Sequence, residues 1–452
     1  MEYIRRFSFP FLLIILTSAI SFLNYTPGTF LTGWDTLHPE LNFSQSFSNI
    51  FFGVFRTDQG LGAVAAHAHM ADLPRIILLW VFSFVLPLSF LRYAIVFLCL
   101  ILGPLGVYFF IRKVLSIQYP VSSKILNTQY RILNTEVSAF LGALVYLFNL
   151  GTVQHFYVPF EMFLVQYASL GWLFLFAAKF IEKRSLKIFM LFALATFLAS
   201  AMAYASVLWY TYFTAFLLFL GTIFLIKRSK KVFLSSLFLI IVTLTVNSYW
   251  ILPNIYFLTH AANQVSLAEV NKLFSDEAFL HNKEYGNIFD AAILRNFLFN
   301  WTQTIDINTS EDLMIYWKAH LLGPAVLAIG YAVALASAAG IIISIARRSV
   351  SGIATIPVFI LAFIMLINMN PPFEGIFSYL RDNFPLFREG MRFPFTKFSI
   401  LLMFSLSVFF AISCSEIFRM LEKLRAKYTK PIFSFGFAVI VGACLFWYGA
   451  PV

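Results

Sequence analysis

Long apolar segments separated by short polar stretches recur along the whole chain. They predict membrane-spanning helices, because about 20 consecutive apolar residues cross a bilayer as a helix. The expected spans are residues 8–24, 92–111, 137–153, 162–181, 187–204, 206–226, 232–251, 319–345, 353–369, 395–416 and 432–450. This pattern predicts an all-α polytopic bundle of eleven spans, forming one transmembrane domain over residues 1–452. Two connections, 25–91 and 252–318, are long and polar enough to form structured loops.

The apolar stretch "LPRIILLWVFSFVLPLSF", residues 73–90, is short and bracketed by Pro74 and Pro87. Basic loop residues decide whether it crosses the membrane, because Lys and Arg collect on the cytoplasmic side. The basic clusters are "RRF", "IRKVL", "EKRSLK", "IKRSKK", "ARRS" and "FRMLEKLRAKYTK". They share one side only if residues 73–111 cross once, which makes 73–90 an interfacial or re-entrant helix.

This topology places the N-terminus inside and both long loops outside the plasma membrane. The inside then holds about 21 Lys and Arg against 5 Asp and Glu, and the outside about 11 against 16. Pro27, Gly28 and Gly33 favour turns directly after the first span, and residues 36–55 are expected to lie along the membrane interface.

Composition supports a membrane protein. The chain of 452 residues is 60% hydrophobic and 12% charged, whereas soluble domains carry about 25% charged residues. The formal charge of +11 is assigned to cytoplasmic loops rather than to nucleic-acid binding. Cys99, Cys414 and Cys444 lie in apolar segments, so they indicate neither a disulfide framework nor a metal site.

The sequence ends at "FWYGAPV", directly after the last expected span. We expect it to be the membrane part of a longer protein, with an exported domain beyond residue 452.

Carboxylates collect in the expected outer loops and are scarce within the spans. They are Asp35, Glu40, Asp58, Asp72, Glu161, Glu374, Asp382 and Glu389. Ion-coupled transporters place ionisable groups near the membrane midplane, so this distribution argues against one. An enzyme acting at the outer face fits it, and so do simple solvated loops.

Two stretches carry a resemblance to a known family. "PGTFLTGWDTLHPELNFSQSFSNIFFGVFRTDQGLG" follows the first span, and "LR" opens the second. "FPLFREGMRFPFTKFSI" precedes a late span. Together they resemble the membrane glycosyltransferases of the GT-C superfamily, in particular its arabinofuranosyltransferase-type branch.

The resemblance implies transfer of a sugar from a polyprenyl-phosphate donor to a cell-envelope glycan, lipid or protein, with inversion. Asp35, in the Asp-Thr pair, would be the catalytic base that takes the acceptor proton. Glu40, Asp58 and Glu161 are the alternatives, and Glu40 and Glu161 are also candidates for substrate binding.

The departing lipid phosphate needs positive charge. Arg388 and Arg392 are four residues apart and would share a helix face, with Lys397 just beyond. Their place on the outer side, against the positive-inside bias, favours phosphate binding. Contact with lipid headgroups, or pairing with Glu389 and Asp382, is the alternative.

"AHAHMAD" supplies His67, His69 and Asp72 as weak candidate metal ligands. No cofactor is firmly predicted, and a divalent metal stays open because some GT-C enzymes use one. Two other functions also stay open: a flippase or transporter of lipid-linked glycans, and a non-enzymatic membrane scaffold.

Overall fold

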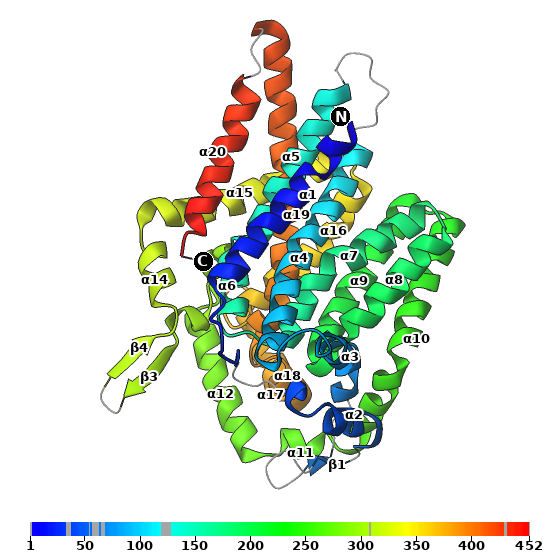
Figure 1. The fold of residues 1–452 in the computed structure, drawn as a ribbon, viewed down its shortest axis with the longest axis vertical. Helices are drawn as coiled ribbons and strands as arrows, with labels where there is room; N and C mark the ends of the chain where they lie inside the picture. Colours follow the sequence, from blue (N-terminus) through cyan, green and yellow to red (C-terminus); the bar gives the residue numbers. More distant parts are fainter. Residues whose placement is uncertain are drawn as a thin grey trace.

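The computed structural model describes residues 2–32, 38–53, 55–56, 63–64, 68–118, 128–306, 309–428 and 432–451. These residues form an all-α protein built on a bundle of long apolar helices (Figure 1). The long helices are α1 (Glu2–Leu23), α4 (Leu88–Gln118), α5 (Thr128–Leu147), α7 (Glu161–Glu182), α8 (Leu186–Ala199), α9 (Ser206–Lys227), α10 (Lys230–His260), α15 (Pro324–Ala346), α16 (Val350–Ile367), α19 (Pro394–Tyr428) and α20 (Ile432–Tyr448).

Shorter elements connect these helices. The short α-helices are α2 (Phe43–Phe52), α3 (Leu73–Phe82), α6 (Leu150–Tyr157), α11 (Asn263–Ser266), α12 (Glu269–Glu284), α13 (Ile288–Ile293), α14 (Ile315–Leu321), α17 (Glu374–Asn383) and α18 (Pro385–Gly390). The 3₁₀ turns are η1 (Pro39–Leu41), η2 (Ala68–Asp72), η3 (Ser200–Tyr204) and η4 (Phe297–Asn300). Two small antiparallel hairpins pair β1 (Phe55–Arg56) with β2 (Ala63–Val64), and β3 (Thr302–Asp306) with β4 (Thr309–Asp312).

Among the described residues, eight helices are long and apolar enough to cross a membrane. A ninth candidate is the pair α5 and α6, which is bent by 47° at the break between them. Asn149 makes this break, because its side chain caps α6 by accepting from the backbone N–H of Thr152. The predicted spans 8–24 and 432–450 coincide with apolar helices whose described apolar parts are shorter, so the count of eleven stays a prediction.

The segment 73–90 forms no full-length span. Helix α3 has ten residues, about 15 Å of helix, which is half the thickness of a bilayer core. It ends at Phe82, and α4 then begins at Leu88. The single crossing predicted for residues 73–111 agrees with this arrangement.

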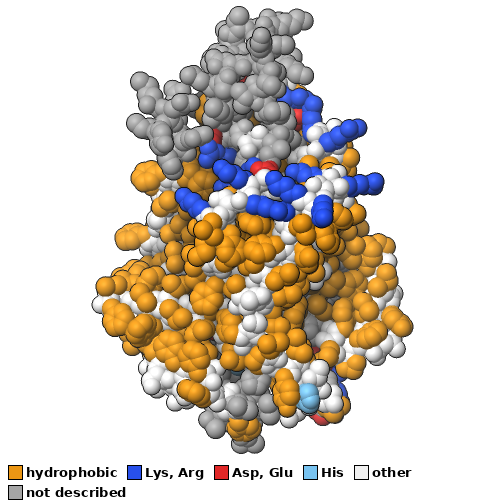
Figure 2. All heavy atoms as spheres, turned by 90° about the vertical axis from the view of Figure 1, so that its right-hand side faces the viewer, with side chains coloured by type: hydrophobic (Ala, Val, Ile, Leu, Met, Phe, Trp, Pro, Cys, Tyr) orange, Lys and Arg blue, Asp and Glu red, His pale blue; other side chains and the backbone are white. Residues whose placement is uncertain are grey.

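The two ends of the bundle differ in charge. On the face seen in Figure 2, Lys and Arg side chains form a band near one end, and apolar side chains cover the surface below it. The α7–α8 and α9–α10 turns carry exposed basic residues, among them Lys183, Arg184, Lys187, Lys227 and Lys231. We call this end the basic end. The opposite end, which carries α2, α3, α17 and α18, is the loop end (Figure 1).

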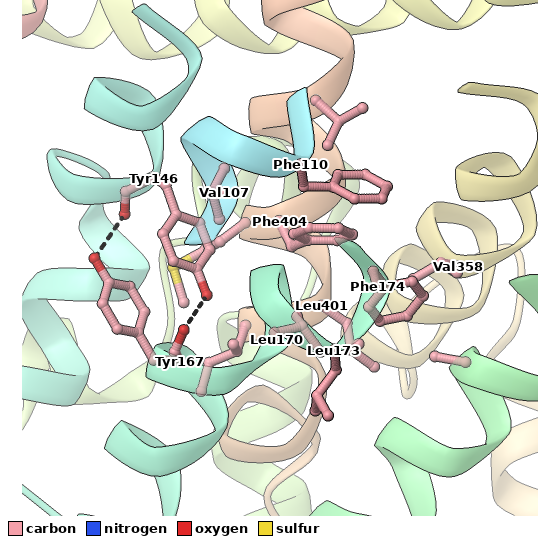
Figure 3. Close-up of a cluster of buried hydrophobic side chains, with 14 of the residues drawn as sticks. Val107, Phe110, Tyr146, Tyr167, Leu170, Leu173, Phe174, Val358, Leu401 and Phe404 are labelled. Carbon is pink, nitrogen blue, oxygen red and sulfur yellow. Dashed lines mark hydrogen bonds between the residues drawn. The ribbon is translucent and has the colours of Figure 1, made fainter. Parts of the chain in front are cut away.

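Helix α19 lies at the centre of the bundle, and its apolar window is completely buried. Phe404 on α19 stacks obliquely with Phe110 of α4 and Phe174 of α7, each at 5.1 Å between ring centroids (Figure 3). Beside them, Tyr146 and Tyr167 stack at 4.4 Å, and each hydroxyl donates to the backbone carbonyl of the other residue. The middle of the bundle is therefore packed with aromatic side chains.

Candidate functional site

A group of charged side chains is buried at the loop end of the bundle. Each member is at most 6% exposed, and we call the group the buried charge cluster. Its members are Glu40, Asp72, Arg75, Arg92 and Glu161. They come from five different elements, η1, η2, α3, α4 and α7. Folding therefore brings together residues from three separate parts of the sequence.

Arg75 is the member held closest to a partner. It lies in the first turn of α3, and its Nε and Nη2 donate to the two carboxylate oxygens of Asp72 at 2.7 and 2.5 Å. Nη1 lies 3.6 Å from Glu161 Oε1, which is beyond hydrogen-bonding distance. Arg75 therefore links Asp72 to Glu161 inside the cluster.

Arg92 joins the first loop to the start of α7. Its Nε lies 2.6 Å from Glu161 Oε1, and its Nη2 donates to the carbonyl of Pro159 at 3.3 Å. Nη1 donates to the carbonyl of Leu31 at 3.1 Å and lies 3.0 Å from His38 Nε2. Glu161 is the first residue of α7, where the helix dipole also favours a carboxylate.

Burial controls the electrostatics of this cluster. It raises the pKa of Asp72, against the lowering effect of Arg75. Burial by itself lowers the pKa of Arg75, but the carboxylates of Asp72 and Glu161 outweigh it and raise the net pKa. The guanidinium of Arg75 therefore stays charged. Glu40 Oε2 is buried without a hydrogen-bond partner.

An apolar groove of about 320 Å³ begins beside Arg75. Its walls come from α4, α7 and α8 and include Ile95, Leu102, Val165, Trp172, Leu194 and Leu198. Leu194 and Leu198 are exposed, so the groove opens on the outer surface of the bundle. Along α7 the lining runs from Val165 to Phe176, about 16 Å of helix. The groove thus has one charged end and a long apolar body.

Asp35, the predicted catalytic base, lies outside the described residues, and so do Asp58 and His67. The described chain on either side of residues 33–37 contacts Arg92 of the buried charge cluster, through Leu31 and His38. Two of the alternatives to Asp35, namely Glu40 and Glu161, are members of that cluster. The turn predicted at Gly28 is present, with a φ of 77°.

The predicted phosphate-binding cations form a second group, which we call the α18 cation group: Arg388, Arg392 and Lys397. Arg388 Nε lies 3.3 Å from Glu389 Oε1, and Arg392 Nη1 lies 3.7 Å from Glu389 Oε2. The two arginines do not share a helix face, because α18 ends at Gly390. The proposed pairing with Glu389 is present, whereas Asp382 pairs with Arg381.

Lys397 and Arg392 also contact aromatic rings. Lys397 Nζ lies 5.8 Å from the ring centre of Phe393, and the Arg392 guanidinium lies 4.9 Å from that of Phe274. These distances are typical of cation–π contacts.

The weak metal candidates are engaged in other contacts. His69 stacks on Tyr204 at 4.6 Å, and both carboxylate oxygens of Asp72 accept from Arg75. Among the described residues, no group of three or more His, Cys, Asp and Glu side chains is arranged to hold a metal ion.

Sequence reasoning missed Arg75 as a site residue and gave no role to Arg92. Each was visible as an arginine in an apolar helix on the expected outer side, against the positive-inside bias. His155 lies buried in α6, and buried Glu161 begins α7.

Comparison with protein-family models, curated proteins and solved structures found no match. The interpretation of the site therefore rests on its own geometry.

Proposed function

We propose that the protein is a membrane glycosyltransferase of the GT-C type. It transfers a sugar from a polyprenyl-phosphate donor to an acceptor hydroxyl of a cell-envelope glycan, lipid or protein. The reaction takes place at the loop end, which faces the outside of the plasma membrane. The observation that carries this proposal is the apolar groove beside Arg75.

The groove fits an isoprenoid chain better than a soluble substrate. A lipid already surrounded by hydrocarbon gains little hydrophobic energy on entering a protein groove, so shape and the headgroup contacts must select it. In this proposal the apolar body supplies the shape, and the guanidinium of Arg75, a residue that lines the groove, supplies the positive charge for the phosphate. A hydrogen bond to a charged group contributes about 1.5–3 kcal/mol.

The chemistry requires a base and a stabilised leaving group. Asp35 is the proposed base, and Arg75 stabilises the lipid phosphate as the bond from its oxygen to the anomeric carbon breaks. The acceptor oxygen attacks the opposite face of the sugar and gives its proton to Asp35. The products are the inverted glycoside and polyprenyl phosphate.

A transporter of lipid-linked glycans is less well supported. It needs a path through the bundle, whereas the centre of the bundle is filled by the stacked rings around Phe404 (Figure 3). A non-enzymatic scaffold gives no reason for two buried arginines beside an apolar groove, since buried ionic groups are costly unless they have a function.

The proposal is tested by turnover in reconstituted membranes. Purified protein is supplied with polyprenyl-phosphate-linked pentoses and hexoses and with an envelope extract as acceptor, and released polyprenyl phosphate is measured. We expect release with at least one donor and none with Asp35→Asn, which keeps the shape and removes the basicity. The proposal is contradicted if no donor releases polyprenyl phosphate. It is also contradicted if the Asp35→Asn variant, expressed at the same level, releases as much as the wild-type protein.

A further inference from the structure

The apolar groove runs along the helices from the loop end toward the basic end. Arg75 marks its start, because it lies 3.6 Å from Glu161, the first residue of α7. From there the lining follows one face of α7 as far as Phe176. A short turn joins Glu182 to Leu186, so α8 runs back antiparallel to α7 (Figure 1). Leu191 of α8 therefore lies opposite Phe176, at the far end of the groove.

Trp172 is fixed in place near this far end. Its indole Nε1 donates to the backbone carbonyl of Leu102 on α4 at 3.0 Å. The ring edge lies against Gly106, where an added Cβ would be 2.8 Å from Trp172 Cδ1. The ring centre of Trp172 is 5.6 Å from that of Phe109 and 5.9 Å from that of Phe176. The indole therefore cannot turn aside into α4 to lengthen the groove.

Beyond Phe176 the same face of α7 becomes charged. Lys179 follows one turn further along, and Glu182 at the end of α7 pairs with Lys113 of α4. A hydrocarbon chain that passed Phe176 would contact these charged groups, which is unfavourable. We call the end formed by Trp172 and Phe176 the closed end of the groove.

The length of the groove limits how much of a lipid it can hold. The lining of α7 from Val165 to Phe176 covers about 16 Å of helix. An isoprene unit adds four carbon–carbon bonds of about 1.5 Å to a chain, which is about 5 Å when extended. About three units therefore fit. On α8 the lining residues Leu191, Leu194 and Leu198 are 37–55% exposed, so a longer chain can leave the groove sideways.

We propose that Trp172 and Phe176 determine how much of the lipid is bound. The groove encloses the three isoprene units next to the phosphate, and the rest of the chain stays in the bilayer. This inference rests on the proposed function for the identity of the ligand, a polyprenyl phosphate whose phosphate lies toward Arg75. It narrows the substrate class to polyprenyl phosphates of three or more units, regardless of their total length.

The first test is a competition experiment with the purified protein in nanodiscs. A radiolabelled three-unit polyprenyl phosphate is the probe, and unlabelled two-, three-, four- and eleven-unit compounds compete at equal mole fractions of the bilayer. We expect the three-, four- and eleven-unit compounds to compete equally. The two-unit compound should compete about ten-fold less well, because about five enclosed carbon atoms are lost. Equal competition by two units, or binding that strengthens steadily beyond three, overturns the inference.

The second test removes the closed end. Trp172→Ala lengthens the groove, so the four-unit compound should then compete better than the three-unit compound. The control is Trp447→Ala on α20, where the side chain is exposed and lies outside the groove, and the wild-type order should remain. A folded Trp172→Ala protein that keeps the wild-type order shows that Trp172 does not set the length.

A third variant answers the case in which Trp172→Ala does not fold. Leu191 is 37% exposed at the closed end, so Leu191→Trp shortens the groove without disturbing the core. We expect the two- and three-unit compounds to compete equally in this variant. Met190→Trp, at the neighbouring exposed position, should keep the preference for three units. An unchanged preference in Leu191→Trp counts against the inference.

Binding and turnover separate the inference from the proposed function. If the competition order and its shifts are as expected but no donor is turned over, the length limit stands and the proposed function fails. If donors with two and three isoprene units are turned over equally well, the proposed function stands and the length limit is wrong.

Discussion

Two groups at the loop end each contain two arginines that face one glutamate. In the buried charge cluster, Arg75 and Arg92 face Glu161 with side-chain exposures of 3–6%. In the α18 cation group, Arg388 and Arg392 face Glu389, and the arginines are 26–29% exposed. The two glutamates are similarly buried, with side-chain exposures of 6% for Glu161 and 7% for Glu389, so the main difference is the burial of the arginines. Only a desolvated pair suffers strongly when one partner is removed.

The largest effect is expected from neutralising the central glutamate of the buried group. Glu161→Gln leaves two guanidiniums buried without their shared charge, and we expect a loss of about 3–5 kcal/mol in stability. Glu389→Gln should cost only about 0–1 kcal/mol, since its arginines can turn to water. Unfolding midpoints of the two purified variants in detergent measure the difference. Equal midpoints contradict the comparison.

A smaller loss of stability is expected from a substitution at the contact between α4 and α7, which form two walls of the groove. A Cβ on Gly171 of α7 would lie 2.4 Å from the backbone carbon of Gly106 on α4, so Gly171→Ala must push the two helices apart. We expect a loss of about 1–3 kcal/mol and weaker donor binding.

The control for Gly171 is Gly221→Ala on α9, where an added Cβ meets no atom within 4 Å. It should be neutral or stabilise by about 0.5–1 kcal/mol. If Gly171→Ala behaves like Gly221→Ala in thermal unfolding and donor binding, the tight α4–α7 contact does not shape the groove.

The smallest effect is expected in the α18 cation group. The sequence-based hypothesis assigns Arg388 and Arg392 to the lipid phosphate, which predicts a cost of about 1.5–3 kcal/mol per lost contact. Their partial exposure and shared pairing with Glu389 lower our expectation to about 0–1 kcal/mol for either alanine variant. The KM for the donor, measured in Arg388→Ala and Arg392→Ala, decides between the larger and the smaller of these two expected costs. A ten-fold rise would restore the original hypothesis.

The same comparison explains what could be predicted from the sequence. The apolar runs predicted the helical bundle, and the charge asymmetry predicted that 73–90 does not form a second span. The α18 cations were visible because they are neighbours in the sequence. The buried charge cluster was not, because Glu40, Arg92 and Glu161 are brought together only by the packing of the first loop, α4 and α7.

Local breaks in helices were also missed. Residues 137–153 were predicted as one span, but the cap at Asn149 bends the chain between α5 and α6. Residues 319–345 were predicted to continue through Gly323, where α14 and α15 instead meet. A polar cap or a glycine inside an apolar run has little weight in a hydropathy pattern, although it changes the direction of the chain.

The central claim is that the groove beside Arg75 holds the lipid of a polyprenyl-phosphate donor, and photolabelling tests it most directly. A polyprenyl phosphate with a diazirine in its tail is bound to the purified protein, irradiated, and mapped by mass spectrometry. We predict adducts on the α4, α7 and α8 residues of the groove, reduced by unlabelled polyprenyl phosphate and by Ala195→Trp, which fills the groove. Met190→Trp, on an exposed part of the same helix, should leave them unchanged. Adducts that are spread over the lipid-facing surface and unaffected by Ala195→Trp would contradict the account.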